Sequence, residues 1–152
     1  MKLSTRSRYG VRLMIALAVA GGNKSVFLKD IAASEDISEK YLSLIVIPLR
    51  AAGLLRSIRG ALGGYALARE PKDISLRDIV EAVEGETCLV NCVKNPDVCK
   101  RVSVCPARDT WTRLSNTIKE AMAAVTLDQL VTDQKGKKSI PKPKARQIKK
   151  QK

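Results

Sequence analysis

Apolar residues recur every three or four positions over most of the chain, a spacing typical of amphipathic helices. The expected helices cover residues 13–20, 26–34, 39–49, 76–83, 107–125 and, as a short final segment, 126–131. Two shorter runs, residues 54–58 and 65–68, have the composition of β-strands and flank a glycine-rich turn. The pattern therefore predicts a mainly α-helical fold with one small β-hairpin.

The two helices over residues 26–49 have the layout of a helix-turn-helix. The break between them falls at residues 35–37, where Ile37 would be a buried turn residue, and Ser38 is placed to cap the second helix. This pattern alone also fits an ordinary pair of antiparallel helices. A hairpin follows directly, however, and a hairpin in that place is typical of a wing. Together these features predict a winged helix-turn-helix.

Five side chains are predicted to contact DNA. Four lie in the first turns of the second helix, ahead of Pro48, on the part that a major groove can admit. The fifth lies at the tip of the hairpin, where a positive charge would be attracted to a narrow minor groove. The candidates are Ser38, Lys40, Tyr41, Ser43 and Arg59. The alternative for the wing is a surface hairpin with a solvated arginine.

The apolar stripe over residues 107–125 is long for the end of a small domain, which has little core left to cover. Its members are Trp111, Leu114, Ile118, Met122 and Val125. We expect this stripe to pack on a second copy of the chain. The result would be a two-fold homodimer, which is how helix-turn-helix proteins contact two half-sites.

The formal net charge of +13 calls for an acidic partner, and double-stranded DNA is the partner we expect. Residues 135–152 contain nine Lys or Arg and no acid, so the rest of the chain carries 13 − 9 = +4. Residues 134–152 are predicted to be a disordered basic tail after a domain over residues 1–133. The apolar run 13–20 resembles part of a signal peptide, but it is too short to span a bilayer. We therefore expect a cytoplasmic protein without a membrane segment.

All four cysteines lie in one short segment, with the spacing C-x3-C-x6-C-x5-C from Cys88 to Cys105. An intracellular chain keeps such thiols reduced, which favours a metal or redox site over disulfides. Zinc sites usually contain C-x2-C pairs, often with histidine, and this chain has neither. Iron–sulfur clusters accept wider spacing. The spacing favours a cluster, while zinc and a thiol redox switch remain open.

With these parts in order, the sequence resembles the Rrf2 family of transcriptional regulators, and within it the iron–sulfur cluster regulator type. The resemblance covers about residues 1–131. It is carried by Met1-Lys2-Leu3-Ser4 with Arg8-Tyr9, Asp30-Ile31-Ala32, Ile37-Ser38 before Tyr41-Leu42, Leu49-Arg50 before Gly53-Leu54, Arg59-Gly60 before Gly63-Gly64-Tyr65, and Cys92, Cys99 and Cys105 before Trp111.

The resemblance implies a DNA-binding part over about residues 1–70, a cysteine loop over 88–105 and a dimerisation helix over about 107–125. It also implies an iron–sulfur cluster held by Cys92, Cys99 and Cys105, with operator binding that depends on the state of the cluster. Whether the cluster is 2Fe-2S or 4Fe-4S stays open.

The fourth cluster ligand cannot be transferred from the family. Family members that use a histidine place it three positions after the third cysteine, where this chain has Arg108, and others use an acid at position 8, where it has Arg8. Neither arginine is an iron ligand. Cys88 is the candidate, although a thiol there could equally be a small buried apolar side chain.

Two other functions compete with cluster-controlled regulation. The first is an Rrf2-type regulator that senses thiol oxidation or nitric oxide without a stable cluster. The second is an iron–sulfur electron-transfer protein. An enzyme is not expected, because no nucleophile–base pair or nucleotide loop is visible and the chain has no histidine for acid–base chemistry.

Overall fold

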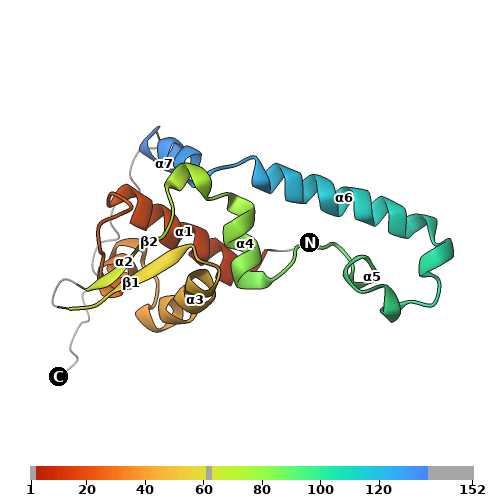
Figure 1. Ribbon diagram of the computed structural model, residues 1–152, viewed down its shortest axis with the longest axis horizontal. Coiled ribbons are helices and arrows are strands. Elements are labelled where there is room, and N and C mark those ends of the chain that lie inside the picture. Colours follow the sequence, from red (N-terminus) through yellow and green to blue (C-terminus); the bar gives the residue numbers. More distant parts are fainter. Residues whose placement is uncertain (1–2, 61–62, 137–152) are drawn as a thin grey trace, which may run out of the picture.

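The computed structural model describes residues 3–60 and 63–136 (Figure 1). The basic tail that the sequence predicts lies outside these residues from position 137 onward. In chain order the elements are α1 (Thr5–Val19), α2 (Leu28–Glu35), α3 (Glu39–Ala51), β1 (Leu55–Ile58), β2 (Gly64–Leu67), η1 (Pro71–Asp73), α4 (Leu76–Glu84), α5 (Asn91–Lys94), η2 (Pro96–Val98), η3 (Val102–Val104), α6 (Pro106–Ala123) and α7 (Leu127–Gly136). The predicted fold class, mainly helical with a small β wing, is confirmed.

Local sequence signals set several helix ends. The Ser75 hydroxyl accepts a hydrogen bond from the backbone N–H of Asp78, and the Asp78 carboxylate accepts one from the backbone N–H of Ser75, so α4 begins with a capping box. Gly85 ends α4 with a φ of 83°, which glycine adopts without strain. At the end of α1, the N–H of Gly22 donates to the carbonyl of Leu17. These ends agree with the sequence prediction.

The core is built from the inner faces of α1, α3 and α4, with contributions from α2 and α7. Its fully or nearly fully buried members include Leu13, Met14 and Leu17 of α1, Ile31 of α2, Leu42, Ile45, Val46 and Leu49 of α3, Ile79 and Val83 of α4, and Leu127 of α7. Ile37, in the turn of the helix-turn-helix, is 7% exposed, as predicted. Each large apolar side chain buried in this way contributes about 2 kcal/mol to stability.

The wing is an antiparallel hairpin whose register runs from Leu55 opposite Leu67 to Ile58 opposite Gly64. Val26 extends it, because its N–H and carbonyl both bond to Tyr65 at 2.9 Å. Gly64 has a φ of 139°, and a Cβ there would overlap the backbone of Val26. Glycine is therefore required where the segment before α2 crosses the hairpin.

The second half of the chain leaves this body and returns to it. In Figure 1, α5 and α6 extend away from the other helices, and α7 turns back to lie along α1. The return is fixed by two backbone bonds of 2.8 Å, from Leu76 N–H to the Val125 carbonyl and from Leu127 N–H to the Ile74 carbonyl. Within the described ranges, no helix is both long and apolar enough to cross a membrane.

Three predictions about local structure need correction. The helix α1 begins at Thr5, well before residue 13, because Ser4 caps it with bonds from the N–H groups of Arg6 and Ser7. The second helix of the helix-turn-helix, expected to end at residue 49, continues through Pro48 to Ala51. The cysteine segment is not an open, helix-free loop either, because it contains α5, η2 and η3.

The prolines explain the last difference. Pro96 and Pro106 occupy the first positions of η2 and α6. The first N–H of a helix has no partner within the helix, so proline is tolerated there and its fixed φ favours the start of a turn.

Candidate DNA-reading surface and cysteine loop

One face of α3 is turned outward along its whole length. The exposed residues are Glu39, Lys40, Ser43, Leu44, Ile47, Arg50 and Ala51, and they recur at helical spacing. The opposite face carries Leu42, Ile45 and Leu49, none of which is exposed. The core therefore holds α3 from one side and presents the other side to a partner.

Three of the predicted DNA contacts lie at the start of this exposed face. Ser38 holds the N-cap position of α3, but its hydroxyl makes no capping bond there. Lys40 is exposed in the first turn. Ser43 is exposed as well, and its hydroxyl donates to the Lys40 carbonyl at 2.7 Å.

Tyr41 is placed differently from the other predicted contacts. It is half-buried, and its ring meets that of Tyr9 edge to face, with centroids 5.6 Å apart and an interplanar angle of 87°. Arg12 lies over the Tyr9 ring and forms an ion pair of 2.9 Å with Glu35. These contacts join α1, α2 and α3, so the Tyr41 ring helps to orient the recognition helix.

Arg59 follows the last residue of β1 and is exposed at the tip of the wing, next to residues 61–62, which lie outside the described chain. Arg56 behaves differently, because its guanidinium donates to the carbonyls of Leu67 and Asn23 and thus braces the hairpin. Arg59 thus lies on the wing, whereas the other predicted DNA contacts lie on α3. The wing and α3 are separate elements, so each is free to enter a different groove of DNA.

Sequence reasoning missed one part of the α3 surface. Leu44 is 53% exposed and Ile47 is 63% exposed, on the same face as Lys40 and Ser43. The signal was available, because two large apolar residues lie three positions apart on the side that the helical pattern assigns to solvent.

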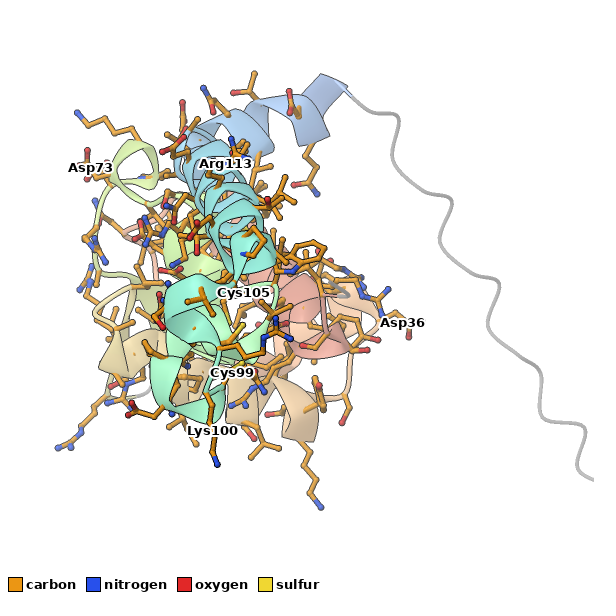
Figure 2. All side chains as sticks on the ribbon, turned by 90° about the vertical axis from the view of Figure 1, so that its right-hand side faces the viewer. Asp36, Asp73, Cys99, Lys100, Cys105 and Arg113 are labelled. Carbon is orange, nitrogen blue, oxygen red and sulfur yellow. The ribbon has the colours of Figure 1, made fainter. Side chains whose placement is uncertain are left out.

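The four cysteines are all half-buried and free of disulfides. Cys88 follows α4, Cys92 lies in α5, Cys99 follows η2, and Cys105 lies between η3 and the first residue of α6. Figure 2 labels Cys99 and Cys105 at the end of the molecule formed by the cysteine loop and the start of α6. Three separate turns thus carry the three thiols for which the family resemblance implies a ligand role.

The donor chemistry of this loop fits a cluster, since thiolates are the usual ligands of iron–sulfur centres. Cys105 also holds the N-cap position of α6, so the start of that helix fixes where its thiol lies. The positions are not converged, however: in the described part of the chain no three Cys, Asp or Glu side chains are arranged to hold a metal ion. A metal-bound loop would need its turns to move toward one another, and metal sites commonly form together with the metal.

Hydrogen bonds fasten the loop to α6 at successive turns. Arg108 donates from Nε to the Cys92 carbonyl at 3.1 Å, and the Leu89 N–H donates to the Ser115 hydroxyl at 3.2 Å. Ser115 is 1% exposed and donates in turn to the Trp111 carbonyl. Arg108, which the sequence excludes as an iron ligand, therefore supports the loop by bonding to the backbone carbonyl of Cys92.

An ion pair marks the third point of attachment. Lys119 on α6 lies 2.7 Å from Glu86, which precedes the cysteines. The hydrogen bond from Lys119, followed by its charge, lowers the pKa of Glu86 below its usual value. Both groups stand near the surface, so the pair orients the loop more than it stabilises the fold.

A second carboxylate connects the start of α1 to the end of α4, just before the cysteine loop. Glu84, at the end of α4, accepts hydrogen bonds from the Ser4 N–H at 2.9 Å and from the Ser7 hydroxyl. Partial burial alone would raise the pKa of Glu84, but these hydrogen bonds and the charge of Arg6 outweigh it and hold the pKa below its usual value. The start of α1 is thus tied to the residue before the turn that leads into the loop.

Comparisons with known proteins agree with this arrangement. The Rrf2 family, described as iron-dependent transcriptional regulators, matches residues 3–133. The transcriptional regulator CymR of Bacillus subtilis is 40% identical over 132 residues, which is 87% of this chain and 91% of CymR. Its solved structure, described as that of the global cysteine regulator of B. subtilis, has a TM-score of 0.72 at 38% identity and covers 88% of this chain and 98% of CymR.

Two further structures resemble the chain over most of its length. T. potens IscR has a TM-score of 0.73 at 34% identity and covers 92% of this chain and 93% of its own. Staphylococcus aureus CymR, solved in an oxidised form, has a TM-score of 0.67 at 39% identity and covers 86% and 96%.

Proposed function

Because the chain belongs to the Rrf2 family of transcriptional regulators, we propose that an iron–sulfur cluster in its cysteine loop controls how α3 and the wing bind an operator. One observation carries the proposal: three free thiols, Cys92, Cys99 and Cys105, lie in a loop that is bonded along α6 and leads directly into it. The description of the family as iron-dependent supports the same metal. DNA is the proposed partner, and Ser38, Lys40, Tyr41, Ser43 and Arg59 are the proposed contacts.

The ligands would be the thiolates of Cys92, Cys99 and Cys105, with Cys88 as the candidate for the fourth. When bound, a cluster supplies a centre that can be oxidised, reduced or lost in response to a signal. The protein's own part is positional. Cys105 is joined to the first turn of α6, and Arg108 and Ser115 hold the preceding turns, so a change in loop shape is passed to α6. Such a change can alter operator affinity only if the two states of the loop favour different relative positions of α3 and the wing.

A second candidate is control by thiol oxidation without a cluster. It is favoured by the half-buried free thiols, by their lack of convergence in the described residues, and by the likeness to CymR, one structure of which is an oxidised form. Thiols that are partly accessible to solvent can be oxidised reversibly.

Visible absorption of protein purified without oxygen tests the first candidate. We expect cluster bands in the native chain and their loss in Cys92→Ala, Cys99→Ala and Cys105→Ala. Cys88→Ala decides the fourth ligand: loss of the bands makes it a ligand, and unchanged bands exclude it. A full-strength spectrum in any of the three single variants would contradict the assignment.

Operator binding with and without oxidant separates the two candidates. If native protein carries no iron, yet a mild thiol oxidant changes operator affinity and the cysteine variants abolish that change, thiol sensing is the function. Sequence-specific DNA binding in either case excludes a simple electron carrier.

We also propose that the chain acts as a homodimer through α6. Trp111 is 40% exposed and Leu114 is 44% exposed on this helix, which extends from the body in Figure 1. Large apolar side chains left in water on an extended helix favour packing against a second copy.

A further inference from the structure

The exposed face of α3 carries an apolar strip formed by Leu44, Ile47 and Pro48. Leu44 and Ile47 are among the most exposed large apolar side chains in the described residues, at 53% and 63%. They lie one turn beyond Lys40 and Ser43, on the same side of the helix. Adjacent exposed apolar side chains form a patch, and such patches mark interaction sites, so this strip on the proposed reading helix indicates contact with an apolar part of a partner.

The surroundings of the strip are cationic on both sides. On one side, the strip borders an open hollow of about 380 Å³ that is also lined by Arg6 at the start of α1. On the other side, Ile47 borders a second hollow, which is lined by Arg50 at the end of α3; Arg56 of β1 also lines it, but its guanidinium is bonded to carbonyls of the hairpin. The strip is therefore an apolar ridge between Arg6 and Arg50.

We propose that Leu44 and Ile47 recognise thymine by packing against its C5-methyl group in the major groove. Thymine is the base that presents a methyl group at the major-groove edge. The flanking arginines fit the phosphates that border such a groove on each side. A second copy of the chain fits less well, because it would bring its own arginines against these and would leave them without counter-charges.

The proposal rests on the DNA-binding function of the chain and is independent of how the cysteine loop works. It assigns to the middle of α3 the recognition of a methyl group, which hydrogen-bonding side chains alone would not provide. It also places Ile47, immediately before Pro48, within the part of the helix that contacts bases. The operator should then contain thymines facing the middle of α3 in each half-site.

Replacement of thymine by deoxyuridine tests this directly, because it removes the methyl group and keeps the base pair. The operator would be selected from a random duplex pool with the full chain, and each thymine would then be replaced in turn. We expect one or two positions per half-site where deoxyuridine weakens binding by about fourfold, the effect of one buried methyl group. Other thymines should show no change.

The variants Leu44→Ala and Ile47→Ala assign the effect to residues. Each should weaken binding to the thymine operator and lose discrimination against deoxyuridine at its own position, while affinity for random DNA stays the same. Val19→Ala is the matched control, because Val19 is 52% exposed but lies on α1. Both α3 substitutions are at exposed sites, and thermal unfolding of the variants checks that the fold is kept.

Three outcomes would overturn the proposal. Equal affinity of the native chain for thymine and deoxyuridine at every position would show that no methyl group is recognised. Discrimination that persists in both variants would assign the methyl contact to other residues. A change in sedimentation coefficient without a change in discrimination would make the strip a protein interface. If the native chain selects no sequence from the pool, the operator-binding function fails along with it.

Discussion

At the scale of single residues, Glu84 gives the fold a dependence on pH. Its pKa is lowered in the folded chain by hydrogen bonds from Ser4 and Ser7, so the folded state favours the carboxylate. The stabilisation is therefore present at pH values above the usual pKa of 4.5 and is lost as the pH falls through the lower pKa of the folded chain.

We expect Glu84→Gln to reduce stability at pH 7 by less than about 1 kcal/mol and to weaken the loss of stability below about pH 4.5. Urea unfolding at pH 7 and at pH 3.5 measures both effects. Glu120→Gln is the control, since it removes the same charge from exposed α6. Equal pH dependence in the two variants would show that the bonds to Ser4 and Ser7 do not stabilise the fold.

Residue-level prediction from sequence succeeded where a local rule decides the outcome. The helix expected over residues 76–83 agrees with α4, whose ends are set by capping at Ser75 and by the backbone conformation of Gly85. Tyr41 illustrates the limit, because its packing on Tyr9 depends on how α1 crosses α3. The spacing of residues along the sequence does not predict how these two helices cross. Arg108 is similar: only the folded loop places its guanidinium beside the Cys92 carbonyl.

At the scale of elements, the contact between the cysteine loop and α6 depends on one buried hydroxyl. Ser115 accepts the hydrogen bond from the Leu89 N–H at 3.2 Å, and it is 1% exposed. We expect Ser115→Ala to cost about 1–3 kcal/mol, because the Leu89 N–H loses its partner in a poorly hydrated place.

Hydrogen–deuterium exchange would locate the effect, with faster exchange expected over residues 88–105 and little change in α2. Thr117→Ala is a matched control, since Thr117 also donates to a carbonyl four residues earlier but is exposed. If both substitutions cost the same, the bond to Leu89 contributes nothing beyond the bond within α6.

The helices of the body could be located from sequence because each buries one regular face. The turns of the cysteine segment could not, because they are too short for any period to appear and hold no fully buried side chain. Pro96 and Pro106 start η2 and α6 locally, and hydrogen bonds to α6 hold the segment in place. The cysteines themselves were found, but how they would gather around a metal was not, since the described chain does not bring them together.

At the scale of the whole molecule, the proposed homodimer would place α6 between the two copies. We expect the double variant Trp111→Ala and Leu114→Ser to shift sedimentation toward the monomer and to weaken operator binding at least tenfold, since each half-site would then be bound separately. Arg113→Ala, between the two positions, is the control. A stable dimer in the double variant would move the interface elsewhere.

The return of α7 to α1 has a consequence for the order of synthesis. Leu127 is completely buried in the same core as Leu13, and backbone bonds from residues 76 and 127 close the body around it. The ribosome makes α3 and the wing long before it makes α7, so the proposed DNA contacts exist in the nascent chain before the core behind them is complete. A chain cut off before α7 would leave part of that core open to water. Only nearly finished polypeptides should therefore compete for the operator.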